Sequence, residues 1–142
     1  MTPEQMQIVR LTFAQASAGR FAVEREFYHR LFVIAPDLRA HFHGDVDAES
    51  VKLQDALALA FGALTDMPFL IATMEGLARR GVARGLSDCH LRAVAKSLLW
   101  AIENRIGPAF TPQVCDAWIA LLAVVVTFLR SPLSGLQSAR AA

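Results

Sequence analysis

Apolar residues recur every three or four positions through almost the whole of this 142-residue chain. That spacing gathers them on one face of an α-helix, whereas a β-strand with one buried face requires alternation of apolar and polar residues. No segment sustains such alternation, and no Asn-Gly or Asp-Gly hairpin turn occurs. The sequence therefore predicts an all-α fold of six to eight helices packed in layers.

Capping residues, prolines and glycines divide the chain into helical segments. Thr2 and Gln5 have the spacing of a capping box, which predicts a helix start. Pro36 ends the second helix, since proline disfavours helical geometry in the residue before it, and Gly107 ends a later one. The residues predicted to face inward are Met6, Val9, Phe13, Phe21, Glu24, Tyr28, Leu31, Ala35, Val46, Glu49, Leu53, Leu57, Ala60, Phe61, Leu64, Leu70, Met74, Leu77, Gly81, Leu91, Val94, Leu98, Ile102, Ile106, Val114, Trp118, Leu121, Val125 and Phe128.

Composition narrows the classes of function. Hydrophobic residues make up 54% and charged residues 19%, which favours a large internal pocket or an oligomer interface such as that of a homodimer. The 14 basic and 13 acidic residues are interspersed, so no electrostatic footprint for nucleic acid is present. Cys89 and Cys115 form neither a metal spacing nor a disulfide framework, which fits a reducing cytoplasm.

The chain length suits one domain. The longest apolar run, 119–129, is shorter than the roughly 18 residues that a membrane span requires. We therefore expect a cytoplasmic protein with no membrane or nucleic-acid partner. We predict a domain over residues 1–131 and a flexible C-terminal tail over residues 132–142, where Pro132 and Gly135 occur.

A series of sequence blocks occurs in order across nearly the whole chain. The blocks are Phe27–Phe32 (FYHRLF), Pro36–Phe42 (PDLRAHF), Lys52-Leu53, Leu77–Arg80 (LARR), Ser97–Ile102 (SLLWAI), Gly107–Pro112 (GPAFTP) and Ala117-Trp118. Together they resemble bacterial single-domain globins of the flavohaemoglobin type. The resemblance implies the globin fold, a haem pocket between two facing helices, and binding of a diatomic gas such as oxygen or nitric oxide.

The resemblance also implies roles for individual positions. Tyr28 looks like the distal tyrosine that donates a hydrogen bond to a bound ligand, and Phe42 looks like the phenylalanine that stacks on the porphyrin. Leu53 and Leu77 look like pocket walls. Glu49 stands where the family usually has glutamine.

The departures from the family cluster at the position of the iron ligand. Gly81 stands where the family has its proximal histidine, and Leu91 stands where it has the tyrosine that supports this histidine. Because haem iron in a globin is held chiefly by one imidazole, reversible oxygen storage is not expected of this chain. The local alternative is that Gly81 marks a helix terminus.

Other residues offer replacement ligands. Glu49 is either buried, which requires a partner or a proton, or raised to solvent at a helix start. If Glu49 is buried near Tyr28, it would accept the phenol proton or ligate iron itself. Tyr28 is a second possible oxygen ligand, and the alternative is an ordinary tyrosine of the core. His41 and His43 flank Phe42, and either turns toward a haem edge or lies exposed at the corner. We expect His29 to point away from Tyr28 and His90 to lie at the surface.

Three hypotheses follow. The first is a globin that holds haem b without a proximal histidine and serves gas or redox sensing, or haem handling. The second is a haem-free globin that acts as a sensory or interaction module, or binds an apolar small molecule. The third treats Gly81 as an engineered change that opens a cavity for added imidazole. Nitric oxide dioxygenation is disfavoured, because it needs reversible oxygen binding and an electron source, and no flavin or nicotinamide domain follows in the sequence.

Overall fold

A computed structural model gives the structure of most of the chain. It describes residues 2–18, 22–42, 45–62, 64, 66, 68–69, 72–73, 75–76, 79–80 and 90–141, with only the backbone of residues 41 and 128–141. The elements are α1 (Pro3–Ala16), α2 (Ala22–Ile34), the 3-10 helix η1 (Pro36–His41), α3 (Val46–Gly62), α5 (Leu91–Ile106), the 3-10 helix η3 (Gly107–Ala109) and α6 (Pro112–Ala141). No strand occurs in this described part, which confirms the predicted all-α fold.

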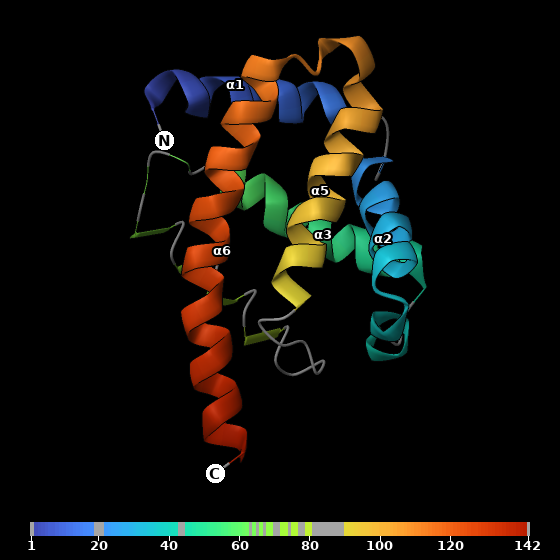
Figure 1. Cartoon of the computed structure of the whole chain (residues 1–142), viewed down its shortest axis with the longest axis vertical. Helices are drawn as coiled ribbons and strands as arrows, with labels where there is room; N and C mark the ends of the chain where they lie inside the picture. Colours follow the sequence, from blue (N-terminus) through green and yellow to red (C-terminus); the bar gives the residue numbers. More distant parts are fainter. Residues whose placement is uncertain are drawn as a thin grey trace.

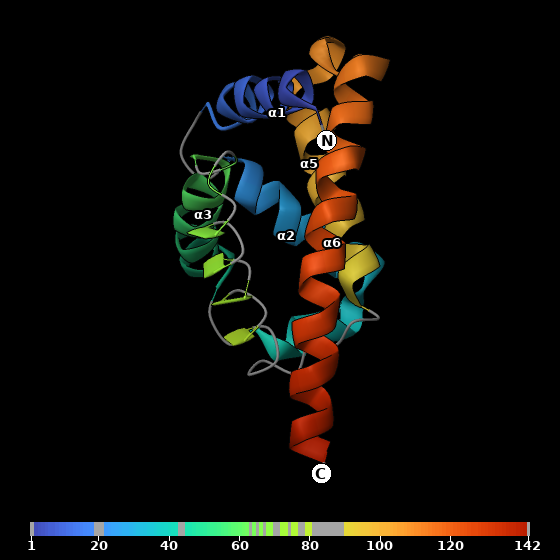
Figure 2. The ribbon, with the colours of Figure 1, turned by 90° about the vertical axis from the view of Figure 1, so that its left-hand side faces the viewer.

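The helices are arranged in layers (Figure 1). In the side view α3 and α6 lie on opposite sides of the molecule, and α2 lies between them (Figure 2). α2 packs on both α3 and α5, while α6 packs on α1 and α5. Buried apolar side chains from every one of these helices form a continuous core.

Trp118 connects the first and last helices within the core. Its side chain is fully buried, and its indole Nε1 donates a hydrogen bond to Thr12 Oγ1 at 2.9 Å. The Thr12 hydroxyl in turn donates to the Ile8 carbonyl at 2.6 Å. Both polar groups are therefore satisfied although they lie in an apolar interior, where an unmade hydrogen bond would be costly.

The predicted helix ends follow local chemistry. Thr2 Oγ1 accepts from the Gln5 N–H at 3.1 Å, and Gln5 Oε1 accepts from the Thr2 N–H at 3.0 Å, which confirms the capping box. Gly107 caps α5 with a φ of 55°, a conformation that favours glycine. Near it, Arg105 Nε donates to the Ala16 carbonyl at 3.1 Å, so the end of α5 satisfies a carbonyl that α1 leaves open.

The last helix is longer than we predicted. The tail prediction began at residue 132, whereas α6 continues as a helix to Ala141 and extends beyond the other helices (Figure 1). Ser131 is therefore not the end of the helix, and the flexibility of the final segment stays a prediction. In the part of the chain that the structure describes, no helix is both long enough and apolar enough to span a membrane.

Candidate functional site

Buried aromatic rings gather between α2 and η1. The ring centroids of Tyr28 and Phe42 lie 5.5 Å apart at 68°, and those of Phe32 and Phe42 lie 5.5 Å apart at 61°. Tyr28 also lies 6.0 Å from Phe32 and 5.1 Å from Phe27. Because edge-to-face pairs stabilise by about 0.5–1.5 kcal/mol beyond their burial, these contacts hold the phenol of Tyr28 in a defined orientation. We call Tyr28, Phe32 and Phe42 the aromatic cluster.

The position of Phe42 follows from the end of α2. Pro36 begins η1, which turns the chain back toward α2 so that Phe42 is buried after it. The Arg39 guanidinium donates from Nη1 to the Phe42 carbonyl at 3.1 Å and lies 5.4 Å from the Phe32 ring centroid. These contacts of Arg39 were not predicted from the sequence, although its spacing of three residues from Phe42 suits one turn of a 3-10 helix.

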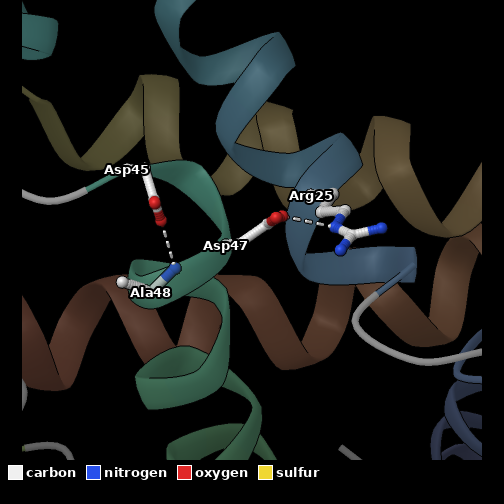
Figure 3. Close-up of polar contacts among 4 residues, drawn as sticks. All are labelled: Arg25, Asp45, Asp47 and Ala48. Atoms are coloured by element: carbon white, nitrogen blue, oxygen red, sulfur yellow. Dashed lines mark hydrogen bonds and ion pairs between the residues drawn. The ribbon is translucent and has the colours of Figure 1, made fainter.

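Polar contacts fix the start of α3 against α2 (Figure 3). Asp45 Oδ1 accepts from the Ala48 N–H at 2.7 Å, and Arg25 Nε donates to Asp47 Oδ1 at 2.7 Å. The Arg25 and Asp47 side chains are 46% and 66% exposed, so their pairing contributes at most about 1 kcal/mol. Its effect is to position the first turn of α3, which carries Glu49.

Glu49 is buried at this helix start. The residue is 5% exposed, so of the two locations considered from the sequence the structure has the buried one. Lys52 Nζ lies 3.7 Å from Glu49 Oε1, but its own side chain is 60% exposed and partly solvated. Leu53, one turn further along α3, is half-buried and packs against the core.

A second buried carboxyl lies one turn before Tyr28. Glu24 is 1% exposed, and its Oε1 has no hydrogen-bond partner among the described residues. Burial raises the pKa of the Glu24 carboxyl, while its own backbone N–H acts in the opposite direction more weakly. The sequence pattern placed Glu24 inward but gave no reason to expect an unsatisfied acid there.

Glu24 should make stability depend on pH. The folded protein holds this proton to higher pH than the unfolded chain, so the free energy of unfolding should fall as pH rises above about 4.5, the ordinary value, toward the raised pKa. Glu24→Gln should remove this part of the pH dependence of the free energy of unfolding, which urea denaturation between pH 4 and pH 8 measures. At pH 7, Glu24→Leu should stabilise the fold by about 1–3 kcal/mol, since an apolar side chain leaves no buried polar group unpaired.

The matched control for Glu24 is Glu103→Gln on the exposed face of α5. This variant should leave the free energy of unfolding, and its dependence on pH, near those of the original protein. An unchanged pH slope in Glu24→Gln would show that this carboxyl has the same pKa in the folded and unfolded chains.

Several predicted site residues lie outside the described residues. These are Leu77, Gly81 and His43, while of His41 only the backbone is described, at the end of η1. The structure thus brings Tyr28 and Phe42 into direct contact and places Glu49 and Leu53 on the helix that packs against α2.

The other two histidines are His29 on α2 and His90 at the start of α5. His29 is exposed, as expected of a neighbour of Tyr28 that points away from it. His90 is partly buried, with 18% of its side chain exposed, and its partner Asp37 is 69% exposed, which is compatible with the expected position at the surface. It lies 3.2 Å from Asp37 Oδ2, because α5 begins next to η1.

The described residues fit the ring of a haem. A porphyrin requires a flat apolar wall, which the buried Phe42 ring and the Leu53 side chain can supply. Buried oxygen donors among the described residues include the phenol of Tyr28 and the carboxyl groups of Glu24 and Glu49. Within the described part of the chain, no group of three or more His, Cys, Asp or Glu side chains could hold a separate metal ion.

Layered helices around a core with an aromatic cluster define a class of all-α protein. The chain belongs to the globin family, since the family model named Globin matches residues 25–129.

Curated relatives point in the same direction. The chain is 31% identical over 123 residues to a flavohemoprotein of Deinococcus radiodurans, which covers 84% of this chain and 30% of that protein. It is 32% identical over 124 residues to a flavohemoprotein of Bordetella pertussis, with 84% and 31% coverage. The chain therefore spans about a third of the length of these relatives.

Solved structures share the fold. An engineered carbene transferase and candidate nitric oxide dioxygenase from Rhodothermus marinus superposes with a TM-score of 0.87 at 20% identity, covering 100% of this chain and 99% of that one. A hexacoordinated heme protein from an anhydrobiotic tardigrade superposes with a TM-score of 0.82 at 13% identity, covering 94% and 96%.

Proposed function

We propose that this globin binds haem b against the aromatic cluster and acts in gas or redox sensing, or in haem handling, rather than in reversible oxygen transport. The observation that carries the proposal is the buried Tyr28–Phe42 pair within a globin fold. Phe42, Leu53 and Leu77 are the proposed walls for the porphyrin. When bound, haem supplies an iron that takes a diatomic gas such as oxygen or nitric oxide.

The proposed departure from oxygen transport rests on Gly81. A glycine has no side-chain donor where the family resemblance implies an imidazole. Tyr28 and Glu49 are the proposed sources of an oxygen ligand, since both are buried and lie on α2 and α3, which pack against each other. His41 and His43 remain weaker candidates because they flank Phe42 in the sequence.

Titration of the purified chain with haemin tests this proposal. We expect a Soret band that saturates at one haemin per chain, and an electron paramagnetic resonance spectrum without the features of imidazole ligation. The heat-unfolded chain gives the reference for non-specific haemin binding. Absence of a saturating Soret band at stoichiometric haemin would contradict the proposal.

The second candidate is a haem-free globin whose site takes an apolar small molecule. The observation that favours it is again Gly81, which supplies no iron ligand. This candidate predicts a colourless protein whose melting temperature is the same with and without haemin. It also predicts saturable binding of an apolar fluorescent probe that haemin fails to displace. A haemin-dependent melting temperature would exclude it.

A further inference from the structure

The outer faces of α2 and α5 form a groove that the proposed haem site does not use. Its volume is about 460 Å³, and its lining residues are Arg30, Ile34, Arg92, Ala93, Lys96 and Trp100. Arg30 follows Tyr28 by two positions, which is a rotation of about 200° around the helix. The groove therefore lies on the face of α2 opposite the aromatic cluster.

Cationic side chains surround this groove. Arg92 and Lys96 are one helical turn apart on α5, and Arg30 faces them from α2. Within the described residues, none of these three side chains forms a hydrogen bond or an ion pair. The carboxylates nearest to Arg30 and Ile34 along the chain, Glu26 and Asp37, are bonded instead to Asn104 at 2.8 Å and His90 at 3.2 Å. The residues that line the groove include three cations and no carboxylate.

The floor of the groove is apolar. Trp100 is half-buried, and Ile34 is 38% exposed although it is a large hydrophobic residue. The Arg30 guanidinium carbon lies 5.2 Å from the Trp100 ring centroid, so a cation–π contact holds Arg30 at the edge of the floor. An apolar floor with a cationic rim suits a ligand that has a carbon body and a negative group.

We infer that this groove binds a small organic phosphate independently of haem. Two guanidinium groups and one ammonium group match a dianion better than a single carboxylate, and guanidinium binds phosphate oxygens through paired N–H donors. The carbon body of the ligand packs on Trp100 and Ile34. A volume of about 460 Å³ is typical of a small-molecule site.

Phenyl phosphate is the probe, titrated into the full chain at low ionic strength. The chain has two tryptophans, Trp100 in the groove and Trp118 in the core, so ¹⁵N NMR of the two indole N–H groups reports location directly. We expect the Trp100 signal, assigned with Trp100→Phe, to move to saturation while the Trp118 signal stays in place. Inorganic phosphate should bind about tenfold more weakly, because it lacks the apolar body.

Charge-neutralising variants distinguish a specific phosphate site from non-specific electrostatic attraction. Arg92→Gln and Lys96→Gln should each weaken phenyl phosphate binding about tenfold in calorimetry, since each removes a charge-assisted hydrogen bond. Arg10→Gln removes an exposed cation on α1 and should change the dissociation constant less than about twofold. Equal weakening in all three variants, an unmoved Trp100 signal at about 10 mM probe, or saturable binding of polyglutamate but not of phenyl phosphate would overturn the inference. Because haemin is absent from this experiment, its result is separate from that of the haemin titration.

Discussion

The Gly81→His variant should bind haemin at least about tenfold more tightly than the original chain, because it supplies the imidazole that the family resemblance implies. Its ferrous form should also take up oxygen reversibly, which the original chain should not do. The measurements are the rate of haemin transfer to an excess of apomyoglobin and the absorption spectrum under air and under argon.

A matched variant controls for added bulk at this position. Gly81→Leu introduces a side chain of similar size without a donor, and it should bind haemin no better than the original chain. Identical haemin transfer rates for Gly81→His and Gly81→Leu would contradict the assignment of residue 81 to the iron ligand. Added imidazole should reproduce part of the histidine effect in the original chain, since the free base supplies the same nitrogen donor.

Tyr28→Phe should change the haem environment without unfolding the protein. Phenylalanine keeps the ring contacts with Phe32 and Phe42, so the melting temperature should stay close to that of the original chain. Loss of the phenol should weaken haemin binding about tenfold and remove any absorption band that arises from phenolate on iron. In the Gly81→His background, the same change should raise the oxygen dissociation rate about tenfold or more, because a hydrogen bond to the ligand is lost.

His29→Gln is the control for Tyr28, since it alters the exposed neighbour on the same helix. It should leave the haemin spectrum and the oxygen dissociation rate unchanged. Glu49→Gln distinguishes the other proposed oxygen ligand. A spectrum that changes in Glu49→Gln but not in Tyr28→Phe would assign the ligand to Glu49 and remove Tyr28 from that role.

Local features of the fold were accessible from the sequence. The capping box at Thr2 and the turn at Gly107 depend on residues within one helical turn, so their chemistry can be read directly. Pro36 is likewise sufficient to end α2. Pro132 was a misleading signal, because α6 continues through it to the end of the described chain.

The candidate site was accessible only in part. The roles of Tyr28 and Phe42 in one haem pocket came from family resemblance, since helical periodicity does not state which elements meet, and their direct contact is known only from the structure. The burial of Glu49 stayed open because it depends on where α3 begins relative to α2, and the Arg25–Asp47 contact that sets this spans two helices. The groove lined by Arg30 and Trp100 is formed by α2 and α5, which are distant in the sequence, so no local sequence pattern predicts it.

The hydrogen bond between Trp118 and Thr12 has a consequence for synthesis on the ribosome. It joins residues 106 positions apart, so α1 packs against a helix that is made much later. A nascent chain that lacks α6 leaves one side of α1 without its partner, and exposed apolar surface of this kind favours aggregation. Folding of this domain is therefore expected to finish only after α6 has left the ribosome, and a chain stalled before Trp118 should be a substrate for chaperones.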